Sequence, residues 1–255
     1  MENNIHLPEG SYHTEKVSYL KESKVQGISK SFIANVFMWM FGGLLITALI
    51  AVWFASNKET LMSALVSVSP SGKPSMSMLG FLVMFAPLGF VLIMSFGYQR
   101  LSATAMSVLY VLYAAINGIS FSFILLAYTA SSVAGCFFSA AAMFGVMAVM
   151  GYTTKKDLTG FGSIMIMGLV GILIAMVINF FLHSSGLDYL ISFVGVLVFT
   201  GLTAYDVQKL KNIGAGADMQ DASAQKLAVF GALNLYLDFI NLFLMLLRLF
   251  GSRRN

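Results

Sequence analysis

The stretch ALNLYLDFINLFLMLLRLF, from Ala232 to Phe250, places a bare carboxylate inside a long apolar segment. About 20 apolar residues are enough for a helix to cross roughly 30 Å of hydrocarbon, so this segment can span a membrane. An aspartate at the centre of such a helix costs roughly 2.5–3.5 kcal/mol. Asp238 therefore needs a partner that lipid cannot supply.

The rest of the chain repeats the apolar pattern of this segment. Hydrophobic residues make up 58% of the sequence and charged residues only 10%, whereas a soluble domain carries about a quarter charged residues. We predict an all-α membrane protein with seven transmembrane helices, at approximately 32–55, 77–98, 103–128, 132–152, 162–182, 189–208 and 227–250. The sequence shows one domain, 32–251, between a polar N-terminal tail, 1–31, and a short C-terminal tail, 252–255.

The polar N-terminal tail holds four Lys and four Glu and has no sustained apolar period. We expect it to be a mobile, solvated extension. With seven spans, ten Lys and Arg fall on the side of the N-terminus and five on the other side. The positive-inside rule then predicts a cytoplasmic N-terminus and an external C-terminus. The last segment is polar enough to be re-entrant instead, which would leave six spans and both termini inside.

A polar stripe runs along one face of the last segment. Its members recur at spacings of four, three, four and three residues, which is one helix face: Asn234, Asp238, Asn241, Met245 and Arg248. We expect Asn234, Asn241 and Tyr236 to hydrogen-bond to neighbouring helices, and they are also candidates for lining a pore or supporting Asp238. Asp238 is the stronger functional candidate, because a neutral Asn would serve packing at less cost.

Asp206 and Arg100 are the other charged candidates. Asp206 could pair with Lys209 at the end of its helix or serve in a functional site. If that helix ends at Lys211, Asp206 lies about 8 Å in, whereas Asp238 lies about 16 Å in. Arg100 could anchor the second and third spans to lipid phosphate or act as a counter-charge to a carboxylate.

Several function classes find no support in the sequence. It contains no phosphate-binding loop, nucleophile elbow, HExxH motif or EF-hand loop, so we expect no enzyme and no cofactor. The single cysteine, Cys136, excludes an intramolecular disulfide and is expected to be a small packed side chain. The basic residues are scattered between apolar segments, so no nucleic-acid partner is expected.

Two motifs resemble a known family. GLTAYDVQKLK, from Gly201 to Lys211, and ALNLYLDFINLFLMLLRLFG, from Ala232 to Gly251, are similar to the terminal segments of the Bax inhibitor-one family, also called the transmembrane Bax inhibitor motif family. The likeness covers roughly residues 30–251, includes TTKKDL after the fourth span, and looks like a bacterial member. It implies six helices wrapped around a central C-terminal helix.

The resemblance also implies the functional residues. It implies that Asp206 and Asp238 form a proton-sensitive gate for calcium leak, with Arg100 paired to Asp206. Some relatives have an acidic residue in the second helix, but none lies between Lys73 and Arg100 here, which leaves the ion path and its selectivity open.

The functional prediction is therefore a pH-sensitive calcium leak channel in a bacterial inner membrane. Its partners would be the lipid bilayer, protons and Ca²⁺, which would bind transiently at Asp206 and Asp238. Two alternatives remain. One is a proton-coupled cation exchanger that uses the same carboxylates. The other is an interaction protein that binds a membrane protease through its N-terminal tail and the loop at 212–225.

Overall fold

The seven predicted membrane helices are all present. The computed structural model describes the backbone of residues 9–68, 74–215 and 217–254, and side chains over 30–67, 75–215 and 217–254. Seven of its helices are long and apolar enough to cross a membrane. They are α1 (Glu9–Ser56), α3 (Met78–Phe96), α4 (Ala103–Ala127), α5 (Ala130–Thr153), α6 (Thr159–Leu182), α7 (Ser185–Gly214) and α8 (Ala222–Phe250).

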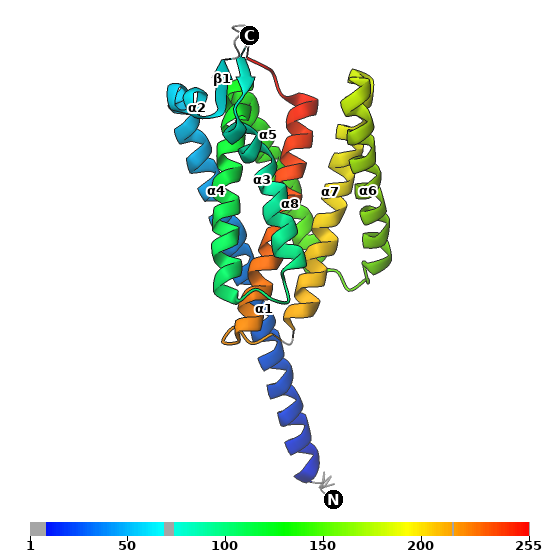
Figure 1. Cartoon of the computed structure of the whole chain (residues 1–255). Coiled ribbons are helices and arrows are strands. Elements are labelled where there is room, and N and C mark those ends of the chain that lie inside the picture. Colours follow the sequence, from blue (N-terminus) through cyan, green and yellow to red (C-terminus); the bar gives the residue numbers. More distant parts are fainter. Residues whose placement is uncertain (1–8, 69–73, 216, 255) are drawn as a thin grey trace, which may run out of the picture.

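The two described ends of the chain lie at opposite ends of the bundle (Figure 1). This is the arrangement that an odd number of crossings requires. The last helix is 29 residues long, about 44 Å at 1.5 Å per residue. The alternative of a re-entrant last segment with both termini on one side is therefore not the observed fold.

The first helix begins much earlier than predicted. Its apolar span is Lys30–Ser56, but α1 starts at Glu9 and its first half projects beyond the bundle (Figure 1). The sequence predicted a mobile, solvated extension here and gave no sign of the helix that the structure shows from Glu9 onward. The membrane span supplies a helix nucleus, and Lys and Glu extend an existing helix at little cost.

A small cap lies between the first and second spans. It consists of the short helix α2 (Lys58–Leu65) and two strands, β1 (Val66–Val68) and β2 (Pro74–Met76). The strands pair antiparallel, with Val66 opposite Met76. Leu61 and Leu65 of α2 are buried in a cluster with Val83 of α3. The sequence indicated only a connection here, because three-residue strands are too short to show a period of two.

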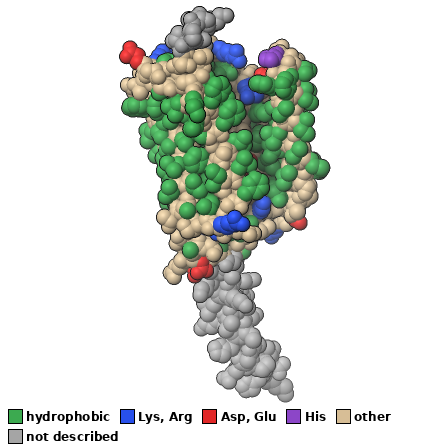
Figure 2. Space-filling model, in the orientation of Figure 1, with side chains coloured by type: hydrophobic (Ala, Val, Ile, Leu, Met, Phe, Trp, Pro, Cys, Tyr) green, Lys and Arg blue, Asp and Glu red, His purple; other side chains and the backbone are tan. Residues whose placement is uncertain are grey.

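The outside of the bundle is suited to hydrocarbon. Apolar side chains cover the flank, and Lys and Arg gather at its two ends (Figure 2). Many large apolar side chains on α6 are more than half exposed, among them Met167 at 65% and Phe180 at 72%. Contiguous exposed apolar surface of this kind marks a membrane-facing protein.

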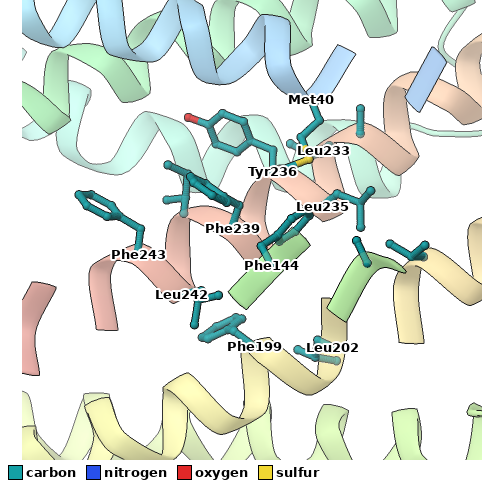
Figure 3. Close-up of a cluster of buried hydrophobic side chains, with 14 of the residues drawn as sticks. Met40, Phe144, Phe199, Leu202, Leu233, Leu235, Tyr236, Phe239, Leu242 and Phe243 are labelled. Atoms are coloured by element: carbon teal, nitrogen blue, oxygen red, sulfur yellow. The ribbon is translucent and has the colours of Figure 1, made fainter. Parts of the chain in front are cut away.

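The C-terminal helix α8 is the most buried of the seven spans. It packs mainly against α1, α4, α5 and α7, while α3 packs on α4 and α6 packs on α7. The predicted wrapping of six helices around the C-terminal helix is not confirmed, because α8 packs mainly against four helices. Figure 3 shows the core at its centre, where Leu235, Phe239 and Leu242 of α8 meet side chains from three other helices.

Close backbone approach holds α5 against α7. A Cβ atom added to Gly151 of α5 would clash with the backbone of Ala204 on α7, two residues before Asp206. Gly145, on the same helix, has open space where a Cβ would be. Glycine is thus required at one position and not at the other.

We expect Gly151→Val to destabilise the bundle by about 1–3 kcal/mol, because the added side chain forces α5 away from α7. Gly145→Val is the matched control and should change stability far less. Thermal unfolding of the purified protein in one detergent would measure both. Equal losses in the two variants would contradict this account of the α5–α7 contact.

Candidate functional site

The polar stripe of α8 faces α7. Asp238 is 5% exposed and contacts Asp206 of α7. Met245 lies against Gly195 of α7. Further along, Arg248 forms an ion pair of 3.5 Å with Asp188, which is also on α7. The stripe therefore meets a neighbouring helix rather than lipid, as membrane burial of polar groups requires.

Asp206 and Asp238 meet across the α7–α8 interface. Their carboxyl groups are within side-chain hydrogen-bonding contact, and Asp206 is half-buried. A hydrogen bond between two carboxyl groups needs a proton on one of them, because two ionised carboxylates have no donor. The Oδ2 atom of Asp238 is buried and receives no hydrogen bond from any described N–H or O–H group. A proton shared by the two carboxyl groups would provide an O–H donor, which the ionised pair lacks.

The register of the two helices explains how carboxylates at different depths can touch. Helices α7 and α8 are antiparallel, and Leu210 lies against Gly231. Asp206 precedes Leu210 by four residues and Asp238 follows Gly231 by seven. The axial offset is therefore three residues, about 5 Å, which two side chains can bridge. The depths predicted from sequence assumed that α7 ends at Lys211, but it continues to Gly214.

Neither nearby cation forms an ion pair with the aspartates. Arg100 lies in the turn between α3 and α4, and its side chain is exposed. Lys209 is also exposed, with Nζ 5.8 Å from the centre of the Tyr205 ring. Arg248–Asp188 is the only ion pair within 4 Å in the part of the chain that the structure describes. The predicted pairing of Arg100 with Asp206 is therefore not present in this conformation.

Tyr236 belongs to a different polar cluster. It is fully buried, and its hydroxyl lies 2.7 Å from Thr47 Oγ1 on α1 and accepts a 3.1 Å bond from Asn117 on α4. Thr47 donates to the Ala114 carbonyl, and Asn117 donates to the Tyr113 hydroxyl. Tyr236 therefore ties α8 to α1 and α4. No hydrogen bond links it to the aspartate pair in the described chain.

The two asparagines of the stripe make few contacts. Asn241 donates a 2.8 Å bond to the Leu237 carbonyl of its own helix. Asn234 is half-buried, and its side chain makes no hydrogen bond within the described residues. The expected hydrogen bonds to neighbouring helices are therefore made by Tyr236 and by neither asparagine.

Sequence reasoning missed a group of hydrogen bonds near the end of α7. Gln208 is 7% exposed; its Oε1 accepts from Leu158 N–H at 2.8 Å, and its Nε2 donates to the Lys156 carbonyl at 2.7 Å. Lys211 donates to the Tyr152 carbonyl at the end of α5. These contacts fasten the segment that carries Asp206 to the α5–α6 connection. Polar residues near a helix end are common, so their spacing gave no signal.

Lys226 plays a similar part at the start of α8. Its Nζ donates to the carbonyls of Tyr98 and Leu101 in the turn after α3 and lies 4.6 Å from the centre of the Tyr98 ring. Lysines thus satisfy carbonyls where α3 and α5 end, a position that favours cations. Lys226 and Lys211 thus each hold two elements together at this end of the bundle.

The aspartate pair alone is not a resident metal site. The described residues contain no group of three or more His, Cys, Asp or Glu side chains that could hold a metal ion. Ca²⁺ takes six to eight oxygen ligands. Two carboxyl groups supply at most four, so an ion at this position needs water or carbonyl oxygens as well.

Comparison with known proteins agrees with this architecture. Residues 29–255 match the family described as "Inhibitor of apoptosis-promoting Bax1". The chain is 46% identical over 226 residues to the inner membrane protein YbhL of Escherichia coli, covering 88% of this chain and 93% of that protein. It is 43% identical over 228 residues to an uncharacterized protein of Borreliella burgdorferi, covering 89% and 94%. With its seven membrane helices and its two C-terminal motifs, the chain belongs to the Bax inhibitor family.

Proposed function

We propose that this protein is a pH-sensitive calcium leak channel in which Asp206 and Asp238 form the gate. The observation that supports the proposal is the contact of two carboxyl groups between α7 and α8, with Asp238 almost fully buried. A buried acidic residue in a membrane helix marks a functional site by default. Structural packing would not require an acid at both positions.

The shared proton accounts for a closed state. Two carboxyl groups in contact in a low-dielectric interior cannot easily both ionise, so they titrate as a unit. While one proton is held between them, the pair draws α7 and α8 together. When that proton leaves, two negative charges face each other and the contact becomes repulsive. Loss of the proton therefore favours separation of the two helices, and leak increases as pH rises on the side from which the proton is lost.

The separated carboxylates suit a hard cation. Oxygen ligands are what Ca²⁺ prefers, and few protein ligands make a weak, quickly exchanging site. Binding that is too strong would stop conduction. Transient contact of Ca²⁺ with Asp206 and Asp238, completed by water, is thus the form of binding that a leak pathway needs.

The gate lies toward the N-terminal side of the membrane in this proposal. Asp206 is eight residues from the end of α7, at the end of the bundle from which α1 projects (Figure 1). The count of Lys and Arg predicts that this side is cytoplasmic, and YbhL is an inner membrane protein. We therefore propose that the pair senses cytoplasmic pH in a bacterial inner membrane.

A specific observation supports each of two other functions. A proton shared by two carboxyl groups would equally serve a proton-coupled cation exchanger, which would move protons in fixed ratio to Ca²⁺ and against a gradient. The projecting first half of α1 (Figure 1) would serve an interaction protein that binds a membrane protease. Removal of residues 2–29 would test the role as an interaction protein, because Ca²⁺ flux would persist while capture of the protease would be lost.

We expect Asp206→Asn and Asp238→Asn each to abolish most of the pH dependence of Ca²⁺ flux. A neutral amide cannot gain or lose the proton on which the gate depends. The measurement is Ca²⁺ uptake by purified protein in liposomes between pH 5 and 8. Asp188→Asn is the matched control, since Asp188 lies on the same helix but pairs with Arg248. A wild-type pH response in either dyad variant would remove the gate from this pair.

Tyr236→Phe should lower stability without removing the pH response. The change deletes the hydroxyl that joins α8 to Thr47 and Asn117, and leaving their groups unpaired costs about 1 kcal/mol in a membrane protein. Thermal unfolding and the same flux assay would test this. A stable variant with a lost pH response would instead place Tyr236 in the gate.

Arg100→Gln tests the remaining residue of the predicted site. Because Arg100 is exposed and unpaired with either aspartate here, we expect the variant to keep a pH-dependent flux with an unchanged midpoint. A shift of the midpoint by one pH unit or more would show that Arg100 meets the pair in another conformation.

A further inference from the structure

A deep apolar crevice opens on the side of the bundle, separate from the aspartate pair. Its volume is about 530 Å³, and it is walled by α1, α4 and α5, with Ile240 and Phe243 of α8 as its floor. Almost all of the lining is apolar. The exceptions include Thr47, whose hydroxyl is already bonded to Ala114 and Tyr236, and Arg254 at one end.

The crevice is elongated. Its lining residues on α1 run from Leu44 to Ser56, a rise of about 18 Å along the helix. An apolar lining over that length suits an extended hydrocarbon chain.

Arg254 lines the crevice at the end formed by the α4–α5 connection. The C-terminal segment is pinned to the α4–α5 connection, where Arg254 N–H donates to the Ala127 carbonyl at 2.8 Å and Thr129 N–H donates to the Ser252 carbonyl at 3.0 Å. This holds Arg254 in the lining. Its guanidinium has no acidic partner within 4 Å among the described residues, and no Asp or Glu lines the crevice.

We propose that this crevice binds one acyl chain of an anionic phospholipid, whose phosphate is held by Arg254. An apolar cavity of this kind is not a site for water, and its volume and few polar groups match small-molecule pockets. The rim is exposed toward lipid, with Phe138 at 71% and Val52 at 56%, so a phospholipid can enter sideways from the surrounding leaflet. The guanidinium pairs with a phosphate, and it favours a lipid whose phosphate charge is not offset by an ammonium group in the same headgroup.

The bound chain would contact the helix that carries Asp238. Ile240 and Phe243 follow Asp238 on α8, and Thr47 joins the crevice wall to the Tyr236 cluster. An occupant would fill the space between α1 and α5 and so hold α8 in its packed position. Stabilisation of the fold by this lipid does not depend on the proposed channel activity.

The test uses the full-length, delipidated protein in detergent. Native mass spectrometry and thermal unfolding would compare phosphatidylglycerol with phosphatidylcholine of identical acyl chains, and with the free fatty acid. We expect phosphatidylglycerol to bind about fivefold more tightly than phosphatidylcholine, because one basic residue near an anionic headgroup contributes about 1 kcal/mol to binding. Phosphatidylglycerol should also raise the unfolding temperature. Equal retention of the two phospholipids, or tight binding of the fatty acid alone, would overturn the proposal.

Two pairs of variants locate the site. Ala134→Trp fills the crevice from α5 and should abolish phospholipid retention, whereas Ala142→Trp, at an exposed position two turns further along that helix and outside the crevice, should not. Arg254→Gln should remove the preference for phosphatidylglycerol, and its neighbour change Arg253→Gln should keep it. Wild-type binding by Ala134→Trp would contradict the assignment. So would an equal effect of the two arginine changes.

Discussion

The contact between Asp206 and Asp238 is the constraint to which the rest of the bundle is fitted. Asp238 sits on the most buried helix, where an isolated charge could not remain. A second carboxyl group on the facing helix lets the two acids share a proton, so that the pair carries one negative charge instead of two. The antiparallel register of α7 and α8, fixed by Leu210 against Gly231, brings the two carboxyl groups within reach. The close approach of Gly151 to Ala204 then holds α5 beside the same stretch of α7.

The two faces of α8 have different chemistry, and this division suits the proposed gate. On one face, Tyr236 is held by hydroxyl and amide groups of α1 and α4 that keep their protonation across physiological pH. On the other face, Asp238 meets Asp206 of α7, and in the proposed gate this contact depends on a shared proton. A change at Asp238 can therefore alter the α7–α8 contact without breaking the contacts of α8 with α1 and α4. The two hydrogen bonds of Gln208 join α7 to the α5–α6 connection.

Much of this could be predicted from the sequence because hydrocarbon imposes simple rules. Charge-free segments of about 20 residues identified the spans, and a polar stripe with a single acid identified the face of α8 that needs a partner. The extension of α1 to Glu9 was missed, since a charged segment next to a membrane helix shows no apolar period even when it continues the helix. The roles of Gln208 and Lys226 were also missed, because their partners are backbone carbonyls and amides far away in the sequence.

The sequence by itself determined that this chain is a seven-helix membrane protein with an acid in its last helix, since both follow from hydropathy and from the cost of burying charge. Only the tertiary structure decided which groups meet. It brings Asp206 to Asp238, assigns Tyr236 to α1 and α4, and leaves Arg100 at the surface. Such pairings depend on helix register and rotation. Hydropathy is the same for any register that keeps apolar side chains toward lipid, so it cannot choose among them.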